Sequence, residues 1–181
     1  MTTLVLHKET EKHHLVTLNR PEKRNALNTH MRKELINILQ SINDELPIFF
    51  EGIGPCFCAG LDLKEHINEE VITEYKKLIG IIQKIKNKTS AIIEGSVRGG
   101  GLIIALSCDR TYAVQEASFG MPNFDFIENQ YIKAALQFYV NQDERLIKLV
   151  EAENAVTAAI ALERSLINKI LKPNFKIDEL L

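Results

Sequence analysis

Two short apolar runs, each followed by a glycine-rich loop and then by a stretch with helical spacing, restrict the possible folds. The runs are "PIFFEG" at 47–52 and "SAIIEG" at 90–95. Strands that are apolar throughout are typical of sheets covered on both faces. Two further runs, "RTYAVQ" and "ASFGM", continue the alternation. Because strands, loops and helices alternate in this way, the sequence predicts an α/β fold.

The whole chain, residues 1–181, is expected to form one domain, with a core over residues 1–123. Segments 3–9 and 13–19 alternate between apolar and polar residues and predict a β-hairpin. Thr29 is expected to cap a first helix, and a second helix is expected from His66. The loop "GIGPCFCAG" contains too much glycine for regular structure, and the remainder, 124–181, is expected to be mostly helical.

Charge and cysteine content narrow the class of protein. The 181 residues carry a formal net charge of −2, which gives no electrostatic reason to expect nucleic-acid or membrane partners. Three cysteines, Cys56, Cys58 and Cys108, are too few for a disulfide framework and indicate reduced thiols. The N-terminus does not resemble a secretory signal, so we expect a cytoplasmic protein.

The stretch "RGGGLI" at 98–103 places three glycines where a helix is expected to begin. The first amides of a helix lack intrahelical partners, and glycine lets a ligand approach them closely. The loop "GPCFCAGLDLKE" also follows a buried strand and precedes a helix, so each loop could direct one amide at the same oxygen. Such a pair would form an oxyanion hole. The alternative is that the glycines only permit a tight turn and close packing.

Four blocks in this order carry a family resemblance: "NRPEKRNALN", "GIGPCFCAGLDLKE", "AIIEGSVRGGGLIIALSCD" and "ASFGMPN". They resemble the signature blocks of the crotonase (enoyl-CoA hydratase/isomerase) superfamily. The resemblance implies a stack of β-β-α units, here with the C-terminal helical segment largely absent. It also implies an acyl-CoA or acyl-carrier thioester as substrate, no cofactor besides the coenzyme A of that substrate, no metal, and a possible homo-oligomer, a trimer by family analogy.

The resemblance further implies which residues form the site. By motif position, the two amide donors of the oxyanion hole fall at Leu61 and Gly100. The adenine and phosphates of coenzyme A are expected near four residues: Arg24, Ala26, Ala59 and Lys64.

The sequence departs from the family where hydratases carry two glutamates, because those positions hold Ile103 and Asn123. Isoleucine transfers no proton and asparagine is no base near neutral pH, so a standard hydratase is disfavoured. Glu128 falls near the acid of one isomerase branch, with Asp125 as a second candidate. The alternative role for Glu128 is a solvated residue that caps the following helix.

These residues favour an enoyl-CoA double-bond isomerase that stabilises an enolate. Two alternatives stay open, a non-catalytic acyl-thioester binding protein and a thioester decarboxylase. His66 could reach the acyl pocket, and Arg98 could contact a carboxylate or phosphate or only cover its loop. Cys56 and Cys58 have no further Cys or His nearby, so zinc is not expected.

Overall fold

Six strands form the larger sheet of the computed structural model, which describes residues 3–122, 124–151 and 155–181. The order is β1-β2-β3-β5-β7-β10, and every neighbouring pair is parallel except β1 and β2. The antiparallel pair confirms the predicted N-terminal hairpin. The strands are β1 Val5–Glu9, β2 His14–Leu18, β3 Ile48–Gly52, β5 Thr89–Ile93, β7 Arg110–Val114 and β10 Lys169–Leu171.

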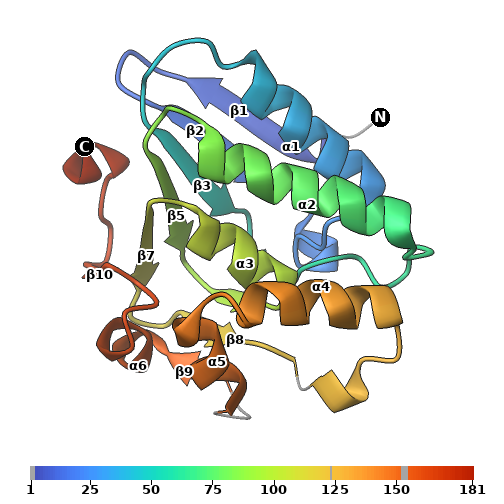
Figure 1. Ribbon diagram of the computed structural model, residues 1–181. Helices are drawn as coiled ribbons and strands as arrows, with labels where there is room; N and C mark the ends of the chain where they lie inside the picture. Colours follow the sequence, from blue (N-terminus) through green and yellow to red (C-terminus); the bar gives the residue numbers. More distant parts are fainter. Residues whose placement is uncertain (1–2, 123, 152–154) are drawn as a thin grey trace.

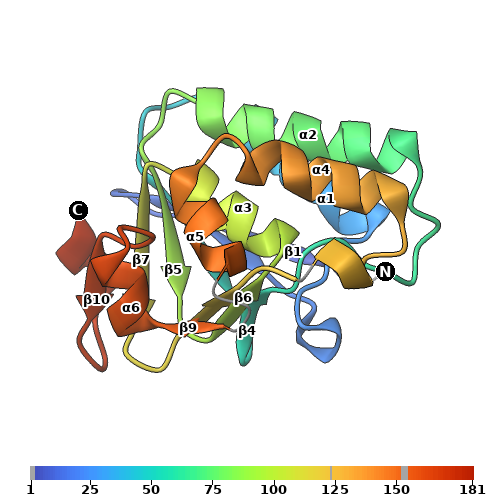
Figure 2. The same cartoon turned by 60° about the horizontal axis from the view of Figure 1, so that its bottom comes forward.

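A second sheet is built from short strands, of which β4, β6 and β8 each follow a strand of the first sheet. Its order is β4-β6-β8-β9, with β4, β6 and β8 parallel and β9 antiparallel. Each of β3, β5 and β7 therefore leads into a partner strand and then into a helix, which confirms the expected stack of β-β-α units (Figure 2). The strands are β4 Cys56–Cys58, β6 Ser96–Arg98, β8 Ser118–Gly120 and β9 Val156–Thr157.

The expectation of an irregular loop over "GIGPCFCAG" is wrong, since β4 lies within it. Strands of three residues are too short to show a sequence period, and pairing with β6 stabilises this one. The region from 124 onward is also less helical than expected, because β9 and β10 add one strand to each sheet.

The described residues form six α-helices that connect or cover the sheets: α1 Thr29–Ser41, α2 Glu69–Lys84, α3 Gly100–Ser107, α4 Gln130–Val140, α5 Glu144–Glu151 and α6 Ala158–Glu163. Short 3-10 turns occupy Pro21–Lys23, Phe124–Phe126 and Ile177–Leu180. None of the helices in the described ranges is long and apolar enough to cross a membrane.

Two predicted helix starts are corrected. Asn28 caps α1, because its side chain accepts a hydrogen bond from Met31 N at 2.9 Å. Helix α2 begins at Glu69, after the cap residue Asn68, so His66 precedes it. Asn and Thr have similar capping preferences, and the packed backbone decided which side chain takes the role.

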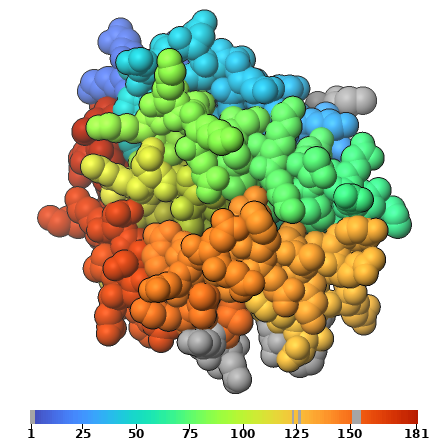
Figure 3. All heavy atoms as spheres, in the orientation of Figure 1, coloured from blue at the N-terminus to red at the C-terminus, as the bar shows by residue number. Residues whose placement is uncertain are grey.

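The main core lies between the six-stranded sheet and the layer of α1, α2 and α3 (Figure 1). Helix α4 packs along α2. The later part of the chain, in orange, occupies the lower part of the face shown in Figure 3. A smaller core on the opposite face of the large sheet joins Phe49 and Tyr112 to the C-terminal residues Phe175 and Leu180.

Candidate active site

The two glycine loops predicted from the sequence meet in space. A Cβ atom added to Gly60 would stand 2.9 Å from the Gly100 amide nitrogen, and one added to Gly100 would stand 3.5 Å from Gly60 Cα. Gly60 and Gly99 have positive φ angles of +92° and +49°, which side chains rarely adopt. The backbones of the two loops therefore touch, and glycine is required for that contact.

Each loop presents one amide at this junction. Leu61 pairs with Leu27 in a parallel bridge, in which Leu27 N donates to Gly60 O and Asp62 N donates to Leu27 O. Gly100 is the first residue of α3, where amides lack intrahelical acceptors. Within the described part of the chain, neither Leu61 N nor Gly100 N donates a hydrogen bond. Both residues line one cavity of about 630 Å³.

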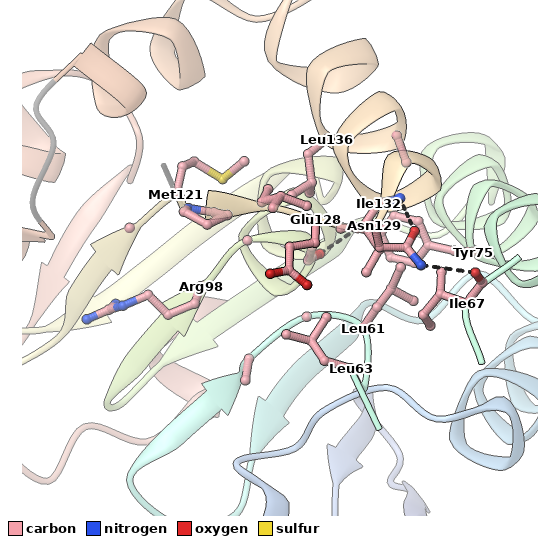
Figure 4. A pocket seen from close by; sticks show the side chains of 18 of the residues that line it. Leu61, Leu63, Ile67, Tyr75, Arg98, Met121, Glu128, Asn129, Ile132 and Leu136 are labelled. Atoms are coloured by element: carbon pink, nitrogen blue, oxygen red, sulfur yellow. Dashed lines mark hydrogen bonds between the residues drawn. The ribbon is translucent and has the colours of Figure 1, made fainter. Parts of the chain in front are cut away.

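The cavity is mostly apolar and lies between the two glycine loops and the start of α4 (Figure 4). Leu63, at its rim, is 76% exposed, the highest value among the large apolar side chains described. A space of this shape suits an apolar chain whose polar end lies against the amides. The apolar side chains on its wall are Leu61, Leu63, Ile67, Met121, Ile127, Ile132 and Leu136.

Glu128 lines the same cavity from the α4 side. Its side chain is exposed, and its carboxylate is directed into the cavity (Figure 4). No hydrogen bond or ion pair joins it to another described residue. The suggestion that Glu128 caps the following helix is wrong, because Asn129 does so. Asp125 lies in the preceding 3-10 turn and does not line the cavity.

The four residues predicted to contact coenzyme A fall into two groups. Ala59 lines the cavity, and its amide donates to Arg24 O at 3.0 Å. Arg24, Ala26 and Lys64 lie on the adjoining loops outside the cavity lining, with the Arg24 and Lys64 side chains exposed. The structure thus brings Leu61, Gly100, Glu128 and Ala59 together and leaves the two cations beside them.

Three residues that hold the loops and helices of the cavity in place were not predicted from the sequence. Arg32 is fully buried and donates to Leu27 O, Thr29 Oγ1, Glu65 and Glu74, at 2.8 to 3.0 Å. The signal was present, because Arg32 follows Met31 at the buried face of α1. A long cation beside such a face needs partners for its charge.

Tyr75 is the second missed residue. Its hydroxyl donates to Gly100 O at 2.6 Å, and it lines the cavity from α2. Burial raises the pKa of Tyr75 well above its usual value, so the hydroxyl stays a neutral donor. The third is Asn129, which caps α4 and donates to Ile67 O at 3.1 Å. A tyrosine and an asparagine at these positions gave no distinguishing pattern.

The remaining candidates have other positions. His66 is exposed and does not line the cavity. Arg98 does line it, but its guanidinium donates to Val97 O, Ser118 O and Ser118 Oγ, so it joins β6 to β8. Cys56 and Cys58 are buried, and burial raises the pKa of Cys58 to about 12. Among the described residues no group of His, Cys, Asp or Glu could hold a metal ion.

Ile103 and Asn123 occupy the two positions at which hydratases of the family are expected to carry glutamates. Ile103 is buried in α3 and lines a second cavity of about 490 Å³ between α2, α3, α4 and α5. Asn123 lies outside the described residues. The described part of the main cavity therefore contains Glu128 and Glu65 as its carboxylates, and Glu65 is already bonded to Arg32 and to Thr29 N.

A profile of the family described as "Enoyl-CoA hydratase/isomerase" matches residues 9–172. The chain belongs to this family. An enoyl-CoA isomerase/hydratase of Mycosarcoma maydis is 34% identical over 128 residues, 61% of this chain and 46% of that protein. The mitochondrial Delta(3,5)-Delta(2,4)-dienoyl-CoA isomerase of Mus musculus is 32% identical over 136 residues, 64% of this chain and 42% of that protein. The chain thus spans less than half the length of the curated relatives that it matches.

Solved structures show the same fold. An enoyl-CoA hydratase from Bacillus anthracis superposes with a TM-score of 0.83 at 24% identity, over 98% of this chain and 74% of that one. An enoyl-CoA hydratase from Mycobacterium smegmatis gives 0.86 at 21% identity, over 99% and 74%. These likenesses establish the crotonase-like architecture of this family member.

Proposed function

We propose that this family member shifts a carbon–carbon double bond within an acyl-CoA thioester. One observation carries the proposal: two amides without acceptors and one carboxylate without a partner among the described residues line the same apolar cavity. The amides of Leu61 and Gly100 would hold the thioester oxygen, and the acyl chain would lie along the apolar wall. The exposed cations Arg24 and Lys64 would face the phosphates of coenzyme A, beside Ala26 and Ala59.

The chemistry needs one group that takes a proton and gives it back. The Glu128 carboxylate removes a proton from the α-carbon of a β,γ-enoyl thioester, and the electron pair moves toward the carbonyl oxygen. The Leu61 and Gly100 amides stabilise that oxyanion, an effect for which one lost donor typically costs about 10²–10³-fold in rate. Glu128 then returns the proton to the γ-carbon, which leaves the α,β-unsaturated thioester.

Hydration would need a second acid or base that positions a water molecule. Ile103 has no proton to transfer and faces the second cavity. Glu65, the other carboxylate of the described cavity, is held by Arg32. A single mobile acid suffices for the isomerisation, and this difference is why we favour it over hydration.

The test is an assay of the purified protein with a β,γ-enoyl-CoA, followed by the ultraviolet absorbance of the conjugated thioester product. We expect turnover by the wild type and a loss of about 10²–10⁴-fold in Glu128→Gln, since general acid–base catalysis contributes that much. Glu116→Gln is the matched control, because Glu116 is an exposed glutamate in the turn between β7 and β8.

The outcomes separate this proposal from the two alternatives. Turnover that is unchanged in Glu128→Gln would remove Glu128 from the mechanism. Saturable binding of the thioester without any turnover would indicate a binding protein. Release of CO₂ from a malonyl-type thioester, detected by mass spectrometry, would indicate a decarboxylase that uses the same two amides.

A further inference from the structure

Asn129 makes hydrogen bonds in two directions. Its Oδ1 accepts from Tyr131 N at 3.0 Å and from Ile132 N at 3.1 Å, which caps α4. Its Nδ2 donates to Ile67 O at 3.1 Å, in the segment that precedes α2. The hydrogen bonds from Ile132 N and to Ile67 O are drawn in Figure 4 as dashed lines that meet at the Asn129 side chain. A helix cap requires the first set alone, so the second needs another explanation.

The second hydrogen bond joins the two segments that carry the proposed chemistry. Ile67 closes the segment 61–67, which begins with the Leu61 amide and includes the exposed Leu63. Asn129 directly follows Glu128. Among the hydrogen bonds of the described residues, this is the link between segment 61–67 and segment 127–136. The α2–α4 contact continues further along, where the Tyr75 and Tyr139 rings meet edge to face at 6.3 Å.

We propose that Asn129 is a positioning residue, which sets the distance between the Glu128 carboxylate and the oxygen held by the Leu61 and Gly100 amides. This inference rests on the proposed function. Glu128 is exposed and has no partner in the described part of the chain, so its backbone is the part that this part of the protein can fix. Misplacement of a reacting group by about 1 Å can cost about 10²-fold in rate, so one such link is enough to matter.

Two substitutions separate the link from the cap. Aspartate and serine both cap helices well, so Asn129→Asp and Asn129→Ser keep α4. Neither can donate to Ile67 O as the amide does, since an ionised carboxylate has no proton and the serine side chain is too short. We expect kcat to fall about 10-fold or more in both variants, with KM changed less than about threefold. Similar losses in both exclude an effect of the charge that aspartate adds.

Amide hydrogen exchange supplies a readout that does not depend on turnover. Loss of the link should speed exchange in segments 61–67 and 127–136 together, while the strands of the large sheet keep their protection. Asn68→Asp is the matched control, because Asn68 caps α2 through Val71 N. It should leave exchange in 127–136 and kcat as in the wild type.

The results distinguish this inference from the proposed function. If the wild type shows no turnover but the Asn129 variants still exchange faster in both segments, the link is supported and isomerisation is refuted. Unchanged exchange, or an equal fall of kcat in Asn68→Asp, would overturn the positioning role. In a Glu128→Gln background, Asn129→Asp should lower the residual rate no further, because a misplaced base cannot matter once the base is gone. An undiminished effect there would also overturn it.

Discussion

The cavity has two walls that are built differently. The amide wall, residues 59–67 and 98–100, presents backbone groups fixed by contacts between glycines and by buried side chains. The α4 wall, residues 127–136, presents side chains from an exposed turn and the face of one helix. Arg32, Asn25 and Asp62 are buried behind the amide wall, whereas Glu128 has no partner in the described structure.

This contrast between the amide wall and the α4 wall shows how one fold can serve several reactions. Oxyanion stabilisation depends on main-chain geometry, so any side chain can stand at Leu61 as long as the glycine contacts remain. Proton transfer depends on a side chain, and a side chain is changed by one substitution. We therefore expect the amide wall to fail as a unit when it is disturbed, and the α4 wall to lose activity without loss of fold. Three predictions test the first half of this comparison.

The largest effect is expected at Arg32, which holds the Leu27 carbonyl and two glutamates behind the amide wall. Arg32→Met keeps an unbranched apolar stem but removes the guanidinium, which leaves Glu65 and Glu74 without their cation. Breaking a buried pair on one side typically costs about 3–5 kcal/mol of unfolding free energy, which denaturant titration would measure. Glu128→Gln is the α4-wall control and should change this free energy by less than about 0.5 kcal/mol. A loss below about 1 kcal/mol in Arg32→Met would contradict the role of Arg32 in stabilising the amide wall.

The next effect is expected at the contact between the two glycine loops. The Cβ of Gly60→Ala would press on Gly100 N in a backbone with φ of +92°, so the loops must separate. We expect a loss of at least about 10²-fold in kcat/KM, since an amide donor is displaced. Gly80→Ala is the matched control, because nothing lies within 4 Å of the added atom on α2. It should gain about 0.5–1 kcal/mol of stability and keep full activity. Equal activity in the two variants would refute the role of the contact.

The smallest effect concerns Asp62, which follows Leu61 and accepts a hydrogen bond from Arg20 at 2.6 Å. Burial alone raises the pKa of Asp62, but the hydrogen bonds from Arg20 and Lys64 N and the nearby positive charge outweigh it and lower the pKa. A lowered pKa contributes stability above the unfolded value of about 3.9, and the contribution disappears as pH falls through the folded value.

Asp62→Asn should therefore be less stable than the wild type at pH 7, by about 1.5–3 kcal/mol. The difference should shrink as the pH falls below about 4, where the unfolded chain gains the proton first, and should be lost once the pH has passed through the lower pKa of the folded carboxylate. Unfolding curves of both proteins between pH 3 and pH 7 would show this. A difference that stays constant over the range would assign the loss to packing rather than to the charge of Asp62.

Much of the fold could be predicted, and the exceptions have one cause. The buried strands, the hairpin and the glycine-led helix α3 followed from local patterns that need no partner to be recognised. Strand β4 did not, because its three residues extend only when β6 pairs with them. The start of α2 at Glu69 was missed for a similar reason, since Asn68 and the packing of the preceding loop determine it.

The order of strands and glycines could be read from the sequence alone, and with it the expectation that two loops each direct one amide at the same oxygen. The family resemblance then assigned those amides to Leu61 and Gly100. The sequence also determined that Ile103 cannot transfer a proton. Tertiary structure decided how the loops meet, that Asn129 rather than Glu128 caps α4, and that the Glu128 carboxylate enters the cavity. Separation along the chain explains which features could be read from the sequence and which could not. Glycine requirements and apolar periods act locally, whereas Asn129 and Ile67 are 62 positions apart and are joined only by packing.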